Sequence, residues 1–276
     1  MRVRRWRTWV AVVLFGFGAP GSGRASEDST SVHLPFRLGE KLTYAIKWGP
    51  LRAGTAVMWV RGVVDVESRP CFHIVSEAQS NAFFSLVYPV TDRVETWVDI
   101  ERLVPLRHEK HLREGTYRQD EVMEFDHAAQ KARYSDGEWI EFEPGVQDIL
   151  SALYYVRTLK IPQEGSIFVE NQTNKKNYTL EVVIRRRERI QTPAGAFLCS
   201  VIEPFLKATG LFKQEGRLWI WLTEDDRRLP VVMKSKIRVG SITAELEDIS
   251  FETIAVGATA GLEGGRGEHE GHEPPE

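Results

Sequence analysis

The sequence has few of the residues and motifs that carry enzyme chemistry. It contains only two cysteines, Cys71 and Cys199, too few for a disulfide-rich scaffold or a thiolate zinc site. It has no G-x-S-x-G elbow, no H-E-x-x-H pair, no P-loop and no G-x-G-x-x-G fingerprint. We therefore predict no catalytic residue, no metal site and no cofactor, and the sequence leans away from an enzyme.

The N-terminus has the three parts of a secretory signal peptide. Four arginines between positions 2 and 7 precede an apolar run from Trp9 to Phe17, which is too short to anchor a mature protein in a bilayer. Gly23 and Ala25 then place small residues at −3 and −1 of a cleavage site. We predict that residues 1–25 are removed on export to the periplasm of a Gram-negative-type bacterium.

Excess positive charge is absent from the predicted mature chain. Removal of residues 1–25 leaves 31 Lys and Arg against 39 Asp and Glu, a net charge of −8, which argues against a nucleic-acid partner. No later apolar stretch is long enough to span a membrane. We predict a flexible segment at 26–35, a single β-rich domain at 36–254 and a disordered Gly- and Glu-rich tail at 255–276.

One stretch, residues 146–160, has a helical pattern. Its apolar residues recur at the spacing of one helix face: Val146, Ile149, Leu150, Leu153 and Val156. The remaining stripe is polar but almost uncharged, so most sides of this helix should be covered. Strict alternation elsewhere, as in residues 42–48 and 178–184, predicts strands. We predict a mainly β fold, in which an antiparallel, strongly curved sheet or open β-barrel wraps around one central helix at about 146–160.

Several local features carry their own predictions. The almost wholly charged residues 107–114 indicate an edge strand or a solvated hairpin arm. Residues 81–89 are apolar without a period, which favours a short core segment over an exposed aromatic lip. Asp136-Gly137 predicts a tight hairpin. In two places a Trp-bearing strand runs through a polar turn into a strand opened by a proline, Pro105 or Pro230, which predicts one hairpin type used twice.

The polar clusters favour structural roles. His108 and His111 point to opposite faces of a strand, so they make a poor metal site. Asp148 could form an acid–hydroxyl pair with Ser151, but a contact with free helix N–H groups or a strand cation is the better interpretation. Cys71 and Cys199 both lie in strand-like segments of an exported chain, and either a disulfide or two buried thiols fits.

Aromatic residues give the most suggestive pattern, with eight Trp, seven Tyr and thirteen Phe. Trp219 and Trp221 share one strand face, and the opposite face is aliphatic, so this strand lies between two layers or lines a cavity. The hypothetical ligand-binding set combines these aromatics with the neutral stripe of the helix: Gln147, Ser151, Tyr154, Tyr155, Trp219, Trp221 and Phe84.

Motifs spread over residues 36–252 together resemble one bacterial family, the domain of unknown function 3108. They are Phe36-x-x-Gly39-Glu40-x-Leu42-x-Tyr44, Trp48-Gly49-x-Leu51-x-Ala53-Gly54, residues 147–157, Thr192-Pro193-x-Gly195-x-Phe197-x-Cys199, and residues 221–231 from Trp221 to Val231. The resemblance implies an exported, mainly β envelope protein, and it brings no activity, cofactor or site residue. A more distant analogy is to periplasmic lipoprotein carriers, whose curved sheets enclose an apolar cavity.

The leading hypothesis is a non-enzymatic periplasmic protein that binds a hydrophobic or amphipathic envelope molecule, such as a lipid, or an envelope protein partner. The alternatives are a hydrolase of an envelope polymer, which needs a carboxylate beside a second acid or a His, and a structural or assembly partner in the cell envelope. The charged stretch 107–114 and the acidic tail would carry the assembly role.

Overall fold

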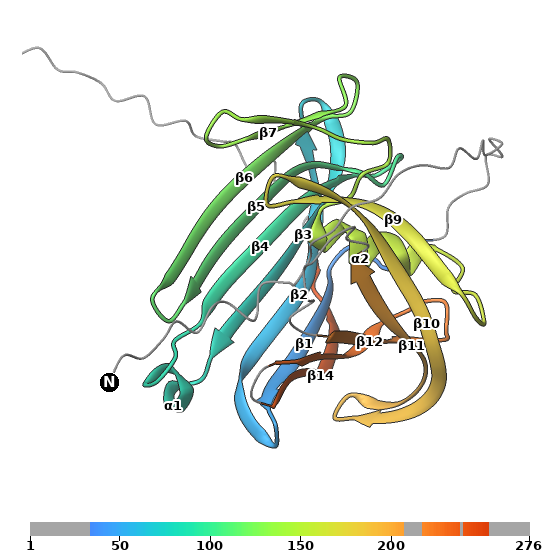
Figure 1. Ribbon diagram of the computed structural model, residues 1–276. Helices are drawn as coiled ribbons and strands as arrows, with labels where there is room; N and C mark the ends of the chain where they lie inside the picture. Colours follow the sequence, from blue (N-terminus) through green and yellow to red (C-terminus); the bar gives the residue numbers. More distant parts are fainter. Residues whose placement is uncertain (1–33, 207–216, 238–239, 254–276) are drawn as a thin grey trace, which may run out of the picture.

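A computed structural model describes residues 34–206, 217–237 and 240–253. The predicted signal peptide, residues 26–33 of the predicted flexible segment and the predicted tail lie outside these ranges. Within them, antiparallel strands form one 14-stranded sheet that does not close on itself (Figure 1). The predicted mainly β, antiparallel architecture is confirmed.

The strands and helices follow the alternation and periodicity of the sequence. The strands are β1 (Glu40–Trp48), β2 (Leu51–Val66), β3 (Arg69–Ser80), β4 (Thr91–Asp99), β5 (Pro105–Glu114), β6 (Tyr117–Asp126), β7 (Lys131–Tyr134), β8 (Trp139–Glu141), β9 (Ser166–Thr173), β10 (Lys176–Thr192), β11 (Gly195–Leu206), β12 (Arg217–Thr223), β13 (Pro230–Lys236) and β14 (Ser241–Phe251). The helices are α1 (Ala82–Ser85) and α2 (Ile149–Thr158).

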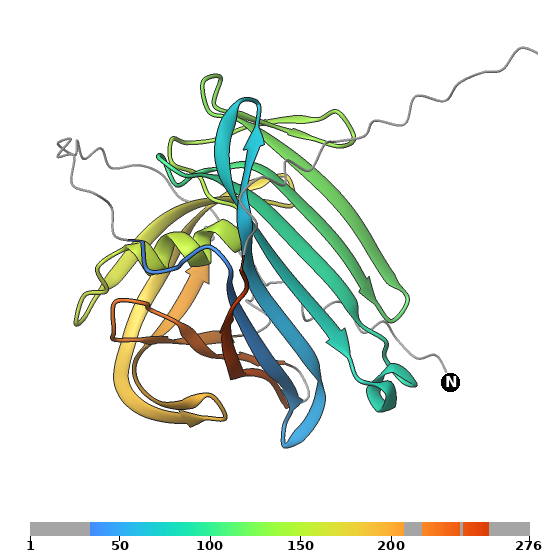
Figure 2. The same cartoon turned by 180° about the vertical axis from the view of Figure 1, so that it is seen from behind.

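The sheet order follows the chain except at one point. Strands β1 to β8 run in sequence toward one edge, and β14 to β9 run in reverse sequence toward the other. The two runs join where β1 pairs with β14, with Glu40 opposite Phe251 and Trp48 opposite Ile242. The first and last strands therefore lie in the middle of the sheet, whose edges are β8 and β9. Figures 1 and 2 show that the sheet is strongly curved.

Helix α2 contributes apolar side chains to two hydrophobic clusters. Leu150 and Tyr154 belong to a cluster with residues of β1 to β4 and β11 to β14. Ala152 and Val156 belong to a second cluster, built mainly from β9 to β12. Each of these four side chains has at most 6% of its surface exposed. The helix therefore buries different sides against different strands, as its low charge requires.

Helix α2 begins three residues later than the predicted start at residue 146. The residues before it are extended, because Gln147 forms a parallel bridge to Asn171 of β9. The Gln147 backbone N–H donates to Glu170 O at 2.8 Å, and Gln147 O accepts from the Gln172 N–H at 2.8 Å. Apolar periodicity cannot detect this bridge, so it extended the predicted helix into a strand-like segment.

The edge-strand alternative for residues 107–114 and the core interpretation of residues 81–89 are wrong. The charged stretch 107–114 falls in β5, which is not an edge, because it pairs with β4 on one side and β6 on the other. Its alternate residues are buried, and Lys110 reaches Glu121 on β6 at 2.9 Å. Lys110 therefore pairs across strands in a buried position, whereas His111 and Arg113 of this hairpin arm keep 38% of their side chains exposed. Residues 81–89 are not a core segment, since α1 has no buried residue.

The two proline-led hairpins are confirmed and match closely. Strands β5 and β13 begin at Pro105 and Pro230. Each hairpin has a register shift directly after a tryptophan, which brings Val98 opposite Pro105 in one and Leu222 opposite Pro230 in the other. The predicted Asp136-Gly137 turn also joins two paired strands, β7 and β8.

Candidate functional site

A buried carboxylate, Asp148, joins the start of α2 to the sheet. Asp148 Oδ1 accepts the N–H groups of Leu150 and Ser151 at 2.8 and 2.9 Å, and the Asp148 N–H donates to Ser151 Oγ in return. Thr96 Oγ1 of β4 donates to Asp148 Oδ2 at 2.5 Å. His108 Nδ1 of β5 lies 3.2 Å from Asp148 Oδ1. The predicted contact with free helix N–H groups is thus present.

Asp148 and His108 are the carboxylate–histidine pair that hydrolase chemistry would need. Both side chains are fully buried, however, and Asp148 is already occupied by the helix N–H groups and Thr96. Burial alone would raise the pKa of Asp148, but His108, Thr96 and the helix N–H groups together lower it below its usual value. The arrangement stabilises a charged helix cap, and a substrate would find neither group exposed.

The other predicted helix residues are also committed to internal contacts. Ser151 closes the helix cap, and Gln147 Nε2 donates to Leu103 O at 2.9 Å. Tyr154 packs between Phe36, with ring centroids 5.1 Å apart, and the guanidinium of Arg157. Tyr155 is half-buried against the second hydrophobic cluster. None of the pocket-lining residues described below comes from α2.

Phe84 also lies apart from these residues. It belongs to α1 and makes an edge contact with Trp48, at a centroid distance of 6.1 Å. Tyr154, Trp219 and Trp221 share the first hydrophobic cluster, but of the predicted set only the two tryptophans line the pocket.

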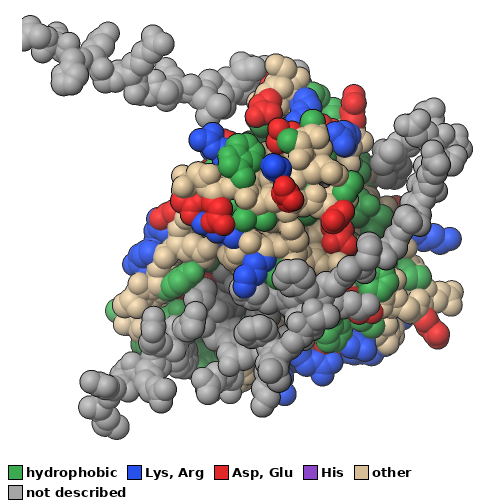
Figure 3. Space-filling model, turned by 45° about the horizontal axis from the view of Figure 1, so that its top comes forward, with side chains coloured by type: hydrophobic (Ala, Val, Ile, Leu, Met, Phe, Trp, Pro, Cys, Tyr) green, Lys and Arg blue, Asp and Glu red, His purple; other side chains and the backbone are tan. Residues whose placement is uncertain are grey.

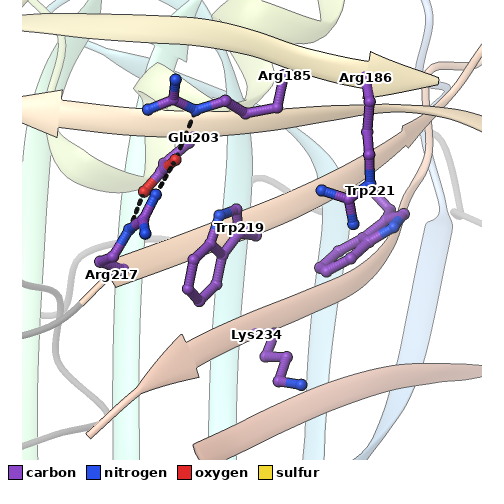
Figure 4. Close-up of a pocket in the computed structure, with 7 residues that line it drawn as sticks. All are labelled: Arg185, Arg186, Glu203, Arg217, Trp219, Trp221 and Lys234. Carbon is purple, nitrogen blue, oxygen red and sulfur yellow. Dashed lines mark hydrogen bonds and ion pairs between the residues drawn. The ribbon is translucent and has the colours of Figure 1, made fainter.

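Trp219 and Trp221 line a pocket on one face of four neighbouring strands, β10 to β13 (Figure 4). Its volume is about 500 Å³, which is in the range of small-molecule sites. Seven residues line it: Arg185, Arg186, Glu203, Arg217, Trp219, Trp221 and Lys234.

Strand geometry explains how these side chains converge. Residues 217, 219 and 221 alternate along β12, so Arg217 and both tryptophans share a face. Lys234 of β13 lies directly opposite Trp219. On β10 the register shifts between Ile184 and Arg186, and this bulge allows consecutive arginines to reach the pocket.

Glu203 organises one side of the pocket. Its carboxylate accepts from Arg185 Nε at 2.6 Å and from Arg217 Nε and Nη2 at 2.6 and 2.9 Å (Figure 4). Burial alone would raise the pKa of Glu203, but the hydrogen bonds from the two arginines lower it below its usual value. Glu203 therefore stays ionised and holds two guanidinium groups in place.

The pocket combines an aromatic surface with excess positive charge. Arg217 lies over the Trp219 ring at 4.8 Å, and Trp221 Nε1 donates to Glu188 Oε1 at 2.7 Å. Four cations and one carboxylate give the lining a net charge of +3, although Glu188 just outside it pairs with Arg186. Lys234 is exposed and has no ion-pair partner among the described residues. Elsewhere, as on the face in Figure 3, both signs of charge lie side by side.

The sequence interpretation missed the charged part of this pocket. The arginine at position 217 precedes Trp219 by two residues, so the same alternation that paired the tryptophans places a cation beside them. Arg185 and Arg186 begin a run of three arginines that directly follows an alternating strand. The bulge that directs them to the pocket has no sequence signal of its own.

The two cysteines are free and buried in this structure. Cys71 lies in β3 and Cys199 in β11, and the disulfide that an exported chain could form is not present. Burial raises the pKa of each thiol to about 12, so neither is a thiolate nucleophile at neutral pH.

The described residues contain neither a metal-ion cluster nor a membrane-spanning helix. No group of three or more His, Cys, Asp or Glu side chains in these ranges is arranged to hold a metal ion. Neither of the helices found there has the length and apolar character needed to cross a bilayer.

Comparison with known proteins places the chain in a family. A family model described as "protein of unknown function (DUF3108)" matches residues 43–247. The chain belongs to the DUF3108 family. The DUF3108 match includes α2 and every residue that lines the pocket. No curated protein matches the sequence significantly.

One solved structure shares the fold of this DUF3108 member at low sequence identity, and a second aligns more weakly. A β-barrel-like protein from Brucella abortus, of the domain of unknown function DUF1849, aligns with a TM-score of 0.55 and 9% identity, over 81% of this chain and 100% of that one. An exported-protein candidate from Bacteroides fragilis, described as YmcC-like in fold, aligns at a TM-score of 0.35 and 13% identity, over 79% and 98% of the two chains. The first likeness shows a shared fold alone.

Proposed function

We propose that this protein is a non-enzymatic periplasmic binding protein whose pocket between β10 and β13 takes an anionic, amphipathic molecule of the cell envelope. The observation that carries the proposal is the pairing of two tryptophans with four cations in one pocket of about 500 Å³. Indole rings offer a flat apolar surface, and guanidinium groups bind phosphate or carboxylate through paired N–H groups.

The charge balance of the chain supports an anionic ligand. The predicted mature chain carries a net charge of −8, yet the pocket lining is positive. Arg185 and Arg217 keep 38% and 53% of their side chains exposed, so a ligand can meet them without displacing the core. Lys234 adds a charge that no described carboxylate neutralises.

The architecture gives this pocket a rigid frame. We infer that the curved sheet of a single domain, residues 36–254, wraps around α2, since the helix contributes to both hydrophobic clusters. The second cluster includes Ile220 and Leu222, which alternate with the two tryptophans on β12. The tryptophan face of β12 packs on the first cluster, where Trp221 is buried at 7% exposure, and Trp219 is partly exposed toward the pocket. The N-terminal signal pattern supports export.

The alternative functions have weaker support. A hydrolase would use the Asp148–His108 pair, but both side chains have no exposed surface. An assembly role based on residues 107–114 would need free charges, and in β5 the cations Arg107 and Lys110 pair with Glu109 and Glu121. A neutral apolar ligand would leave the cations of the pocket without a role.

Binding of a defined probe tests the proposal. The mature protein would be titrated calorimetrically with dihexanoyl phosphatidylglycerol, and separately with the zwitterionic dihexanoyl phosphatidylcholine, below their micellar concentrations. We expect the anionic lipid to bind at least about tenfold more tightly. Phosphatidylglycerol carries a net negative charge that the cations can bind, whereas the charges of phosphatidylcholine cancel. Trp219→Ala and Lys234→Ala should each weaken binding at least about threefold.

Trp139→Ala is the matched control. Trp139 lies on β8, outside the pocket, with 53% of its surface exposed, so its removal should leave the affinity unchanged. Equal affinity for the two lipids, or wild-type affinity in Trp219→Ala, would reject the pocket as an anionic amphiphile site.

A further inference from the structure

The most exposed apolar side chains lie together at one end of the sheet. Among the large hydrophobic residues of the described ranges, the four highest exposed fractions are 85% for Leu86, 85% for Val87, 71% for Phe83 and 56% for Leu51. We call these four residues the apolar rim. Figures 1 and 2 show α1 and the β1–β2 turn at the same end of the sheet, with α1 lying beyond the strand ends.

Hydrogen bonds hold this rim to the sheet. The Asn81 N–H donates to Ala53 O at 2.8 Å, and Asn81 Nδ2 donates to Arg52 O at 2.7 Å, which ties α1 to the start of β2. On the other side, the Gly115 N–H donates to Pro89 O at 2.7 Å, which ties the segment to the β5–β6 turn. These hydrogen bonds hold the backbone that carries the apolar rim. Exposure of each rim side chain to water is unfavourable in free energy.

The charges around the rim are arranged asymmetrically. Residues 81–90 include no charged side chain. Arg118, the second residue of β6, is exposed, and its guanidinium donates to the backbone oxygens of Gly115 and Tyr117. Asp92, which follows the rim segment, is 7% exposed, Glu247 binds Arg52, and the exposed Asp120 of β6 binds Arg113. The rim thus presents apolar groups next to an uncompensated cation.

We propose that the apolar rim inserts into the surface of an anionic lipid bilayer. A projecting segment that carries aliphatic and aromatic side chains and no charged one fits a deformable apolar phase. Tyr117, 36% exposed, and Trp48, packed on Phe84, add two aromatic rings of the kind that favour the membrane interface. Arg118 supplies the charge that meets lipid phosphate.

This inference is independent of the pocket. The rim residues belong to β2, α1 and the segment after α1, whereas the pocket lies on β10 to β13. The two sites share no residue, so each can be inactivated while the other is tested.

Vesicle sedimentation with the full mature chain tests the inference. The probes are phosphatidylcholine vesicles with and without phosphatidylglycerol. We expect the wild type to sediment with the anionic vesicles, and Leu86→Asp to lower the partition coefficient at least about tenfold because it places a charge in the apolar tip. Arg118→Gln should lose at least half of the preference for anionic over neutral vesicles. The pocket variant Trp219→Ala should partition as the wild type does.

Leu198→Asp is the matched control, because Leu198 is 45% exposed on β11, away from the rim. It should sediment as the wild type does, and circular dichroism should confirm that both Asp variants are folded. Failure of the wild type to sediment, or equal sedimentation of Leu86→Asp, overturns the inference. So does a wild-type dimer in size-exclusion chromatography that Leu86→Asp dissociates, since the rim would then bind a second copy.

Discussion

Asp148 and Glu203 are two buried carboxylates whose partners have different surroundings. Asp148 has no exposed surface, and its side-chain partners Thr96 and His108 have none either. Glu203 is 1% exposed, but its partners Arg185 and Arg217 are 38% and 53% exposed and face a pocket. The comparison teaches that burial of a charged group does not identify a site. The exposure of the partners separates Asp148, whose partners are buried with it, from Glu203, whose partners line the proposed ligand pocket.

The largest expected effect is on stability at the helix cap. Asp148→Ala would leave His108 and two helix N–H groups buried without their acceptor, so we expect a loss of about 3–5 kcal/mol in the free energy of unfolding. Glu203→Ala should cost only about 1 kcal/mol, because water can solvate the two exposed arginines that it releases. Urea denaturation of both variants measures the difference. Equal losses would contradict the comparison.

A third carboxylate, Glu95, has partners of intermediate exposure, since His73 is 14% and Arg93 is 35% exposed. It also extends the comparison to pH. Burial alone would raise its pKa, but hydrogen bonds from His73 and Arg93 lower the pKa from 4.5 to about 2. A depressed pKa stabilises the fold above the unfolded-state value, and that contribution is lost as the pH falls from 4.5 toward 2. We expect about 1–3 kcal/mol of acid-labile stability from this group.

Glu95→Gln is the variant that isolates this contribution. Its unfolding free energy, followed by urea denaturation between pH 6 and pH 2, roughly the range of carboxylate titration, should fall less steeply than that of the wild type. Parallel curves for the two proteins would assign the acid sensitivity to other carboxylates, such as Asp148.

The smallest expected effect concerns the affinity of the pocket. Glu203→Gln removes one negative charge from the lining, so dihexanoyl phosphatidylglycerol should bind about threefold more tightly, as expected for one partly screened charge. The affinity for the zwitterionic lipid should stay constant, which serves as the control in the same calorimetric experiment. Weaker anionic binding would instead show that Glu203 acts mainly by positioning Arg185 and Arg217.

Much of the fold could be predicted from local patterns. Alternation located the strands, Asp136-Gly137 marked a hairpin, and Pro105 and Pro230 marked two matching strand starts. The failures came from interactions between distant residues. The bridge from Gln147 to Asn171 makes the helix start later than predicted. The pair of Lys110 with Glu121 lies across two inner strands, where the charges of residues 107–114 had indicated an edge. Such pairs have no signal in either segment alone.

The candidate site was predicted only in its apolar half. The alternation of Trp219 and Trp221 with aliphatic residues indicated a strand with two useful faces, and both rings line the pocket. The helix residues grouped with them, such as Ser151 and Tyr154, are buried in internal contacts instead. Arg157, the cation of the same helix, is buried too, and it pairs with Glu40 of β1 at 2.7 Å.

The pairing of β1 with β14 has a consequence for the order of folding. The ion pair between Lys41 and Glu252 joins residues 211 positions apart. During synthesis β1 is among the first strands made, yet its second neighbour is the last, so one side of it stays unpaired until the chain is almost complete. High contact order slows folding. The sheet can therefore be completed only after nearly the whole chain has been synthesised.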